Sequence, residues 1–349
     1  MDHSNAVDRE VSGRSQTSPA RTGGSRRRAL LRFAAAMPLV QFAVPAARAQ
    51  AFPSRPLRLI VPFPAGGGTD VMSRLAADVL GPRLGQQVVV MNKAGAAGGI
   101  ASEFVASEPA DGYTLLVAGQ GQLFINKALG RKLSYDPDNG FAFVGMLGAF
   151  PNLLVTNPEV IPAKSLAEFL EAAKAKPGEL TYGSNGVGSL SHLTTEVLAA
   201  TAGVKFLHVP YQGAAPQLAD LLSGRIGFSI VGPQGILPQV KEGKLRVLAV
   251  TTGRRYAALP STPTLVESGF PELDIPVWFG AFVRADTPAA ELEKLRGALA
   301  EATSSPEYKA GLEKQAAQRM EVPVQSATSR FAAERRMWVD AVERTGAKG

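Results

Sequence analysis

The chain of 349 residues contains no cysteine. This absence excludes disulfides, thiol catalysis, Cys-ligated zinc and iron–sulfur clusters at once. It also removes the lipidated cysteine that would tether an exported protein to a membrane. Beyond the first 49 residues, no run of basic residues is interleaved with aromatic ones, so nucleic acid is not an expected partner. We expect neither a metal site nor a cofactor in this protein.

The first 49 residues have the pattern of an export signal. They are rich in Ser and Arg up to Arg28, continue with a weakly apolar stretch and end in the small-x-small site Ala47-Arg48-Ala49. The pair Arg27-Arg28 also fits a twin-arginine signal, so both that route and the general secretory route stay open. The segment carries +5 of the chain's formal +7 and leaves about +2 for the mature part. We expect a soluble, freely diffusing protein in the periplasm.

The mature chain alternates short apolar strands with glycine-rich turns and amphipathic helices. Strands are predicted at 57–61, 88–91 and 113–118, and a helix face repeats apolar residues from Asp70 to about Leu84. This pattern predicts an α/β fold with parallel strands and right-handed crossovers. Ligands of such sheets bind at the carboxyl ends of the strands, where these turns lie.

A second unit of the same kind starts near residue 153. Its strands are predicted at 153–156, 180–183, 206–209, 226–231 and 245–251, followed after Pro276 by one more at 277–284. Terminal helices are expected over 288–304, 306–315 and 327–345. Two units with similar turns suggest two lobes with a ligand cleft between them.

These turns do not contain the motifs expected of an enzyme. Ser189 and His192 share a predicted helix face, but no acid stands near to orient the histidine, and the Gly-x-Ser-x-Gly elbow is absent. The turn at 66–70 lacks the Lys of a phosphate-binding loop and the spacing of a dinucleotide-binding loop. The sequence therefore predicts a binding protein and not an enzyme.

The turns instead predict an anion site made of neutral donors. A glycine-rich turn that opens a helix presents free backbone N–H groups and the positive end of the helix dipole. None of the loops at 64–70 and 184–189 carries Arg or Lys. A carboxylate bound there would be held by backbone N–H groups and small hydroxyls. For Thr69 and Asp70, capping of the helix is the competing interpretation.

These residues resemble the tripartite tricarboxylate transporter substrate-binding proteins, the Bug-type periplasmic solute receptors. The resemblance covers nearly the whole mature chain. It rests on blocks that occur in this order: 52–70, 88–100, 109–116, 180–192, 208–216, 243–250, 259–264 and 278–280. It implies a type II-like periplasmic binding protein of two lobes, each a mainly parallel sheet flanked by helices, with two crossing strands as the hinge. Lobe 1 is then 50–152 plus 280–349, and lobe 2 is 153–279.

The resemblance also implies a small carboxylate held between the lobes and delivered to a two-subunit membrane permease by a monomeric receptor. The same lobes could present the carboxylate to a signalling partner, and that alternative stays open. The family commonly has an Asp that faces the ligand where this chain has Gly232. We therefore expect a di- or tricarboxylate or an aromatic carboxylate without an amino group. The expected ligand-binding residues are Phe63, Pro64, Ala65, Gly66, Gly67, Gly68, Thr69, Asp70, Gln120, Ser184, Asn185, Gly186, Gly188, Ser189, His192, Tyr211, Gly232 and Trp278.

Overall fold

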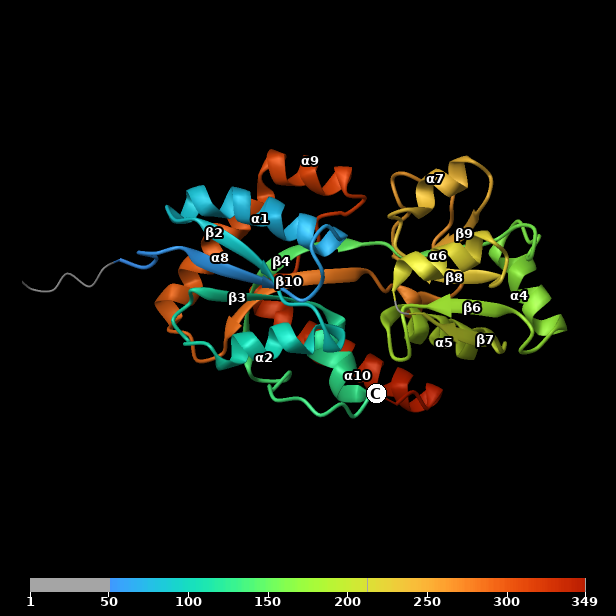
Figure 1. Ribbon diagram of the computed structural model, residues 1–349, viewed down its shortest axis with the longest axis horizontal. Helices are drawn as coiled ribbons and strands as arrows, with labels where there is room; N and C mark the ends of the chain where they lie inside the picture. The colour runs from blue at the N-terminus through green and yellow to red at the C-terminus, as the bar shows by residue number, and fades with distance from the viewer. Residues whose placement is uncertain (1–50, 212, 349) are drawn as a thin grey trace, which may run out of the picture. The chain divides into compact units, whose positions relative to one another are not determined.

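The protein is built on two five-stranded sheets whose strands are connected in a similar order (Figure 1). The structure is a computed structural model and describes residues 51–211 and 213–348. The predicted export signal at 1–49 lies outside these residues. Among the described residues, no helix combines the length and the apolarity needed to cross a bilayer.

The first sheet has the order β2-β1-β3-β10-β4. Strands β1 (Leu57–Val61), β2 (Val88–Asn92) and β3 (Thr114–Ala118) are parallel, whereas β10 (Val277–Arg284) runs antiparallel to β3 and to β4 (Phe141–Phe150). Helices α1 (Gly68–Leu84), α8 (Ala289–Ser304) and α9 (Pro306–Lys314) pack together on one face, and α2 (Gly99–Ser107) lies on the other (Figure 1). Successive side chains of β1 point to opposite faces of the sheet. Leu59 and Ile60 therefore pack into two different buried clusters, one on each face.

The second sheet has the order β7-β6-β8-β5-β9. Strands β6 (Thr181–Ser184), β7 (Leu207–Pro210) and β8 (Phe228–Val231) are parallel. Strand β5 (Leu153–Thr156) is antiparallel to β8 and to β9 (Arg246–Val250). The α-helices described in this half are α4 (Leu166–Ala175), α5 (Leu190–Ala202), α6 (Ala214–Leu222) and α7 (Ile236–Lys241). The two-lobed architecture expected from the sequence is confirmed. Each sheet is mixed, because one strand, β10 or β5, runs against the other four.

The chain passes between the two sheets twice. It leaves the first sheet after β4 and enters β5 three residues later, then returns from β9 through Ile275 and Pro276 to β10. Strand β10 pairs with β4 from Val277 onward, three residues before the lobe boundary that the sequence suggested at 280. The other expected lobe boundaries stay predictions.

Strand β4 is the one long strand that sequence patterns did not predict. Its ten residues are apolar but include Gly145 and Gly148, which weaken a strand pattern. Both glycines admit a close neighbour: a Cβ on Gly145 would lie 3.0 Å from Leu299, and one on Gly148 would lie 2.9 Å from the Met72 sulfur. Helices α8 and α1 therefore pack directly on the backbone of β4.

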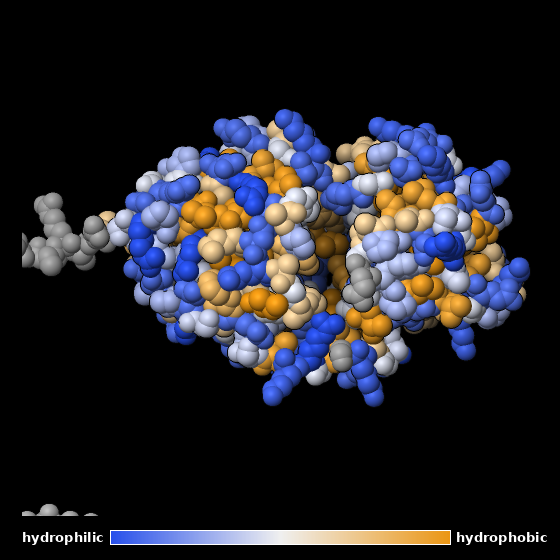
Figure 2. Space-filling view, viewed as in Figure 1, coloured by the Kyte–Doolittle hydropathy of each residue, from blue (hydrophilic) through white to orange (hydrophobic). Residues whose placement is uncertain are grey.

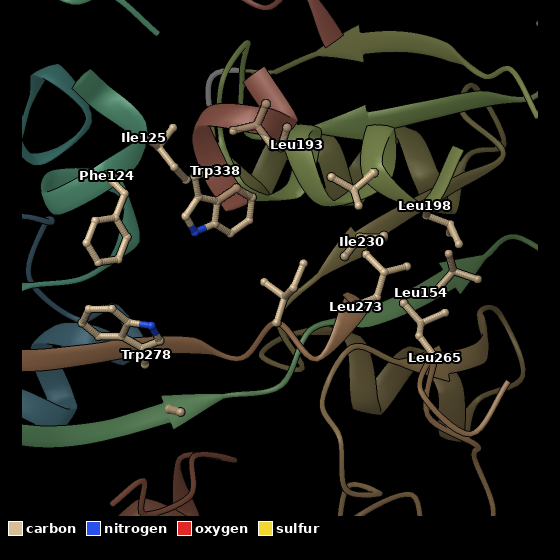
Figure 3. Packing of buried hydrophobic residues seen from close by; sticks show 14 of the residues in the cluster. Phe124, Ile125, Leu154, Leu193, Leu198, Ile230, Leu265, Leu273, Trp278 and Trp338 are labelled. Carbon is tan, nitrogen blue, oxygen red and sulfur yellow. The ribbon is translucent and has the colours of Figure 1, made fainter. Parts of the chain in front are cut away.

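The C-terminal helix α10 (Val324–Thr345) contacts both halves of the molecule. It packs against α3 (Asn126–Ala128), against the short π-helical segment η2 (Gly121–Ile125) that follows β3, and also against α5. Figure 3 shows Trp338 of this helix between Ile125 of η2 and Leu193 of α5. The helix thus lies where the two halves meet.

Candidate functional site

A cavity of about 400 Å³ opens between loops that follow strands of both sheets. Figure 2 shows it as a hollow at the centre of the molecule with apolar residues at its depth. Among the described residues, its walls carry neutral polar side chains and apolar ones, and no Asp, Glu, Lys, Arg or His. The lining residues are Phe63, Gly68, Thr69, Ala97, Gln120, Gly121, Gln122, Ile125, Asn126, Phe150, Asn152, Asn185, Gly188, Ser189, Leu190, Ser191, Ile230, Val231, Gly232, Gln234, Val277 and Phe279.

The first wall is the start of α1. Gly67 precedes the helix with extended backbone angles and no side-chain cap. Within the described part of the chain, no acceptor pairs with the backbone N–H groups of Gly68 and Thr69, and both residues line the cavity. An uncapped helix start keeps its first N–H groups for an anion.

Asp70 does not line the cavity but braces this turn from behind. Its side chain is nearly buried and accepts hydrogen bonds from the Gly66 N–H (2.9 Å), from Asn92 Nδ2 (2.8 Å) and from Arg74 (3.0 Å). Burial alone would raise the pKa of Asp70, but the bonds from Arg74, Gly66 and Asn92 outweigh it and hold the pKa below its usual value. The carboxylate therefore stays charged and fixes the loop from which α1 starts.

The loop from Ser184 to Ser189 forms the opposite wall, but its own N–H groups are mostly occupied. The Asn185 N–H donates to Ser191 Oγ, the Gly188 N–H to His192 Nδ1 and the Ser189 N–H to the Gly186 carbonyl. Ser189 caps α5 by accepting the N–H of His192. The donors left for a ligand here include the N–H groups of Leu190 and Ser191, for which the described residues offer no acceptor, and the Asn185 carboxamide.

Gly188 keeps this second loop close to the first half of the molecule. Its φ of +72° lies in the left-handed region, and a Cβ at this position would come within 2.3 Å of a Leu129 methyl carbon. Glycine alone meets both conditions without strain. The loop therefore approaches the segment after η2 directly, next to the cavity.

A third helix start, which opens η2 after β3, completes the walls. Gln122 shapes the turn, because its side chain accepts the Gly119 N–H (3.0 Å) and donates to the Ala97 carbonyl (2.9 Å). In the part of the chain that is described, the N–H groups of Gln120 and Gly121 find no acceptor. The Gln120 side chain donates to the carbonyl of Pro276 at 2.6 Å. Three helix starts whose N–H groups find no acceptor among the described residues thus line one cavity, and the described lining contains no charged side chain.

The two histidines of the described residues, His192 and His208, stand behind the second loop and do not line the cavity. His192 is 7% exposed, and its ring stacks on that of His208. His208 Nε2 lies 2.6 Å from Ser184 Oγ, but this serine is buried and shares a turn with Gly186. Burial lowers the pKa of both histidines, that of His208 to about 4. The arrangement is a neutral support of the loop, not a catalytic pair open to a substrate.

The structure brings eight of the expected ligand-binding residues to the cavity. These are Phe63, Gly68, Thr69, Gln120, Asn185, Gly188, Ser189 and Gly232. The other ten do not line it: Pro64, Ala65, Gly66, Gly67, Asp70, Ser184, Gly186, His192, Tyr211 and Trp278.

Two of the residues away from the cavity have clear partners elsewhere. The Tyr211 hydroxyl donates to Asp220, and the Trp278 indole donates to Glu334. Trp278 is 1% exposed, because the alternation of β10 turns Val277 and Phe279 to the cavity and Trp278 away from it. Trp278, which the sequence places among the expected ligand-binding residues, therefore does not line this cavity.

Sequence reasoning missed the carboxamides Gln122, Asn126, Asn152 and Gln234, which also line the cavity. A Cβ on Gly232 would lie 2.7 Å from Gln234 Oε1 and 4.0 Å from Asn152 Oδ1. The space beside Gly232 is therefore taken by neutral amides. No sequence motif predicts these carboxamides. Asn152 lies in the segment that joins β4 to β5, and Gln234 lies in the turn after β8.

Comparison of this chain with known proteins identifies its family. A sequence model described as tripartite tricarboxylate transporter family receptor matches residues 72–346. The chain belongs to this receptor family. Its members are substrate-binding receptors and not enzymes. BugT of Bordetella pertussis is 35% identical over 301 residues, which are 86% of this chain and 92% of BugT. A protein from the tcbD–tcbE intergenic region of Pseudomonas sp. strain P51 is 36% identical over 283 residues, 81% of this chain and 83% of that protein.

Solved structures of the receptor family share the fold. Rpa4515 of R. palustris, determined with adipate, is 34% identical with a TM-score of 0.74 and covers 85% of this chain and 99% of its own. MatC from Rhodopseudomonas palustris, determined with bound malate, is 29% identical with a TM-score of 0.71 and covers 83% of this chain and 100% of its own. The periplasmic binding protein BugD is similar at 28% identity and a TM-score of 0.70, with 85% of this chain and 99% of BugD covered.

Proposed function

We propose that this receptor binds a small carboxylate without an amino group in the cavity and delivers it to a two-subunit membrane permease. The observation that carries the proposal is the convergence of three helix starts with unpaired N–H groups on a cavity without charged walls. Each N–H group that binds a carboxylate oxygen makes a charge-assisted hydrogen bond, worth about 1.5–3 kcal/mol. Adipate and malate in the two related structures support the carboxylate class.

The rest of the lining indicates which carboxylates fit. Phe63, Phe150 and Phe279 give the cavity an aromatic side that suits a carbon chain or a ring. An ammonium group would need a carboxylate or several acceptors, and the lining includes no Asp or Glu. Dicarboxylates of medium length and aromatic carboxylates therefore fit better than amino acids.

We further propose that the protein acts in the periplasm, that the export signal is removed and that the monomer closes its two halves on the ligand. The two crossings at 150–153 and 250–277 are the segments about which closure would occur. Charge-assisted bonds from both halves would favour the closed form only when an anion is present.

Titration calorimetry on the mature protein tests the ligand class. The panel contains adipate, malate, citrate, benzoate and glutamate at equal ionic strength. We expect one or more of the first four to bind and glutamate to bind much more weakly. The proposal fails if none of the panel acids gives a heat of binding or shifts the melting temperature, or if glutamate binds best.

A further inference from the structure

The backbone of Asn152, a residue of the cavity lining, is held where the chain passes between the two halves. Its N–H donates to Thr251 Oγ1 at 3.2 Å, and its carbonyl accepts the Thr251 N–H at 2.9 Å. The Thr251 hydroxyl in turn donates to the Ile275 carbonyl at 3.1 Å. Both crossings therefore set the position of Asn152 through backbone contacts that do not use its side chain.

The side chain of Asn152 is buried but has no partner. The residue is 6% exposed, and no hydrogen bond joins its carboxamide to any other residue within 51–211 and 213–348. Buried polar side chains in folded proteins nearly always have a hydrogen-bond partner, and an exception needs an explanation. A free carboxamide in the lining of a ligand cavity is explained by a polar group of the ligand.

Gln234 brings a second carboxamide to the same place. Its amide nitrogen donates to the carbonyl of Gln315, which follows α9 in the other half of the molecule, at 3.3 Å. Its oxygen lies on the side of Gly232: a Cβ on that glycine would be 2.7 Å from Gln234 Oε1 and 4.0 Å from Asn152 Oδ1. Two amide oxygens therefore lie within 4.0 Å of one point beside Gly232, which also lines the cavity.

A hydroxyl group suits these two carboxamides better than a charged substituent does. It donates its proton to an amide oxygen and also accepts from an amide N–H, so it bonds to Asn152 in either orientation of the carboxamide. A second carboxylate would face two acceptor oxygens at this point. An ammonium group would bring a charge and three protons to a cavity whose described lining contains no acid.

We propose that Asn152 and Gln234 form a specificity subsite for a hydroxyl group of the ligand, so that the receptor prefers hydroxycarboxylates to the same acids without the hydroxyl. The proposal rests on the proposed carboxylate function and names a narrower ligand class for the same cavity. The helix starts hold the carboxylate, and the two carboxamides select its substituent. A site built to bond a hydroxyl disfavours the analogue that lacks it, because buried polar groups are then left without partners.

Calorimetric titration with succinate, malate and aspartate tests the subsite. These acids share one carbon frame and differ at one carbon by a hydrogen, a hydroxyl or an ammonium group, and both enantiomers of malate and of aspartate are measured. We expect the better malate enantiomer to bind about fivefold to tenfold more tightly than succinate, the worth of one neutral hydrogen bond. Aspartate should bind most weakly. Succinate binding as tightly as malate, or aspartate binding best, overturns the proposal.

Two alanine variants of cavity carboxamides assign the preference to its residues. Asn152→Ala keeps the backbone bonds to Thr251, so it should remove the preference for malate and leave succinate binding unchanged. Asn185→Ala is the matched control, because it removes a carboxamide that faces the carboxylate. It should weaken malate and succinate by the same factor and keep their ratio. A malate preference that persists in Asn152→Ala overturns the proposal.

Gln234→Ala is the second variant, and because Gln234 is exposed it should fold whether or not Asn152→Ala does. It should also reduce the preference for malate, and an unchanged preference counts against the subsite. The subsite and the proposed function fail in different ways. If adipate or benzoate binds but malate and succinate do not, the subsite is wrong and the carboxylate receptor stands. If none of the acids binds, both proposals are overturned.

Discussion

His192 and His208 stack with ring centroids 4.1 Å apart and an angle of 20° between the ring planes. The Tyr182 ring also stacks on that of His208, with centroids 4.9 Å apart, and its hydroxyl donates to Glu196. His192 Nδ1 accepts the Gly188 N–H, and His208 Nε2 contacts Ser184. The pair therefore supports both ends of the loop that forms one wall of the cavity.

The stacked histidines predict a loss of stability in mild acid. The pKa of His208 is about 4 in the folded protein and that of His192 is also lowered by burial, against about 6.5 for an unfolded chain. Between these values the unfolded chain binds more protons than the folded one. The stabilisation is therefore complete above pH 6.5 and is lost as the pH falls toward 4.

Urea midpoints measured from pH 7.5 to 4 check this expectation. The matched variant is His208→Gln, which cannot titrate but keeps polar atoms near Ser184. The difference between wild type and variant should shrink or reverse as the pH falls, since carboxylates titrate equally in both. Parallel curves for the two proteins would contradict the assignment of the effect to His208.

Gly68→Ala should weaken ligand binding without unfolding the protein. A Cβ at Gly68 would lie 3.1 Å from the Phe150 ring and 3.2 Å from Gln234 Nε2, at the helix start that lines the cavity. It would occupy space that a carboxylate needs beside the N–H groups of α1. We expect affinity for the best panel acid to fall about tenfold or more, because roughly 1.4 kcal/mol already gives that factor.

The control for Gly68→Ala is Gly297→Ala in α8, where a Cβ meets no atom within 4 Å. Gly297→Ala should leave the melting temperature equal to or slightly above that of wild type. Gly68→Ala should lower it slightly, because the buried Phe150 ring must yield to the new Cβ, while the protein stays folded. Calorimetry and thermal unfolding measure the two effects separately. Unaltered affinity in a folded Gly68→Ala protein would show that the ligand does not reach the start of α1.

Gly232→Asp should reverse the ligand preference. The new side chain would displace the Gln234 amide, which is on an exposed residue and has room to move. A carboxylate in the lining repels an anionic ligand and offers a partner to an ammonium group. We expect weaker binding of the panel acid and stronger binding of glutamate, measured by competition. Gly232→Asn, which adds similar bulk without charge, separates repulsion from steric exclusion.

Much of the fold followed from local patterns. The strands that end in glycine-rich turns and the three terminal helices all appear close to their expected positions. These elements can be predicted from the sequence because each combines a hydrophobic periodicity with a turn or capping residue. Strand β4 has no such signal, since it is apolar on both faces and holds glycines required by α1 and α8.

The site was less accessible to sequence reasoning than the fold. The start of α1 was found because three consecutive glycines mark it, and Gly188 and Ser189 were found for a similar reason. Asp70 carries the same local signal, yet its contacts with Arg74 and Asn92 direct it away from the cavity. Asn152 and Gln234 become neighbours only through tertiary structure, because they are 82 residues apart in the sequence.

The position of β10 constrains the order in which the chain can acquire its structure during synthesis. This strand fills the gap between β3 and β4, yet it is made only after the entire second sheet. Until residue 284 has emerged, β3 and β4 have no strand between them, and a fragment that ends at residue 150 leaves both with open edges. Such edges invite aggregation and long-range pairing is slow. The first half is therefore the last to be completed during synthesis.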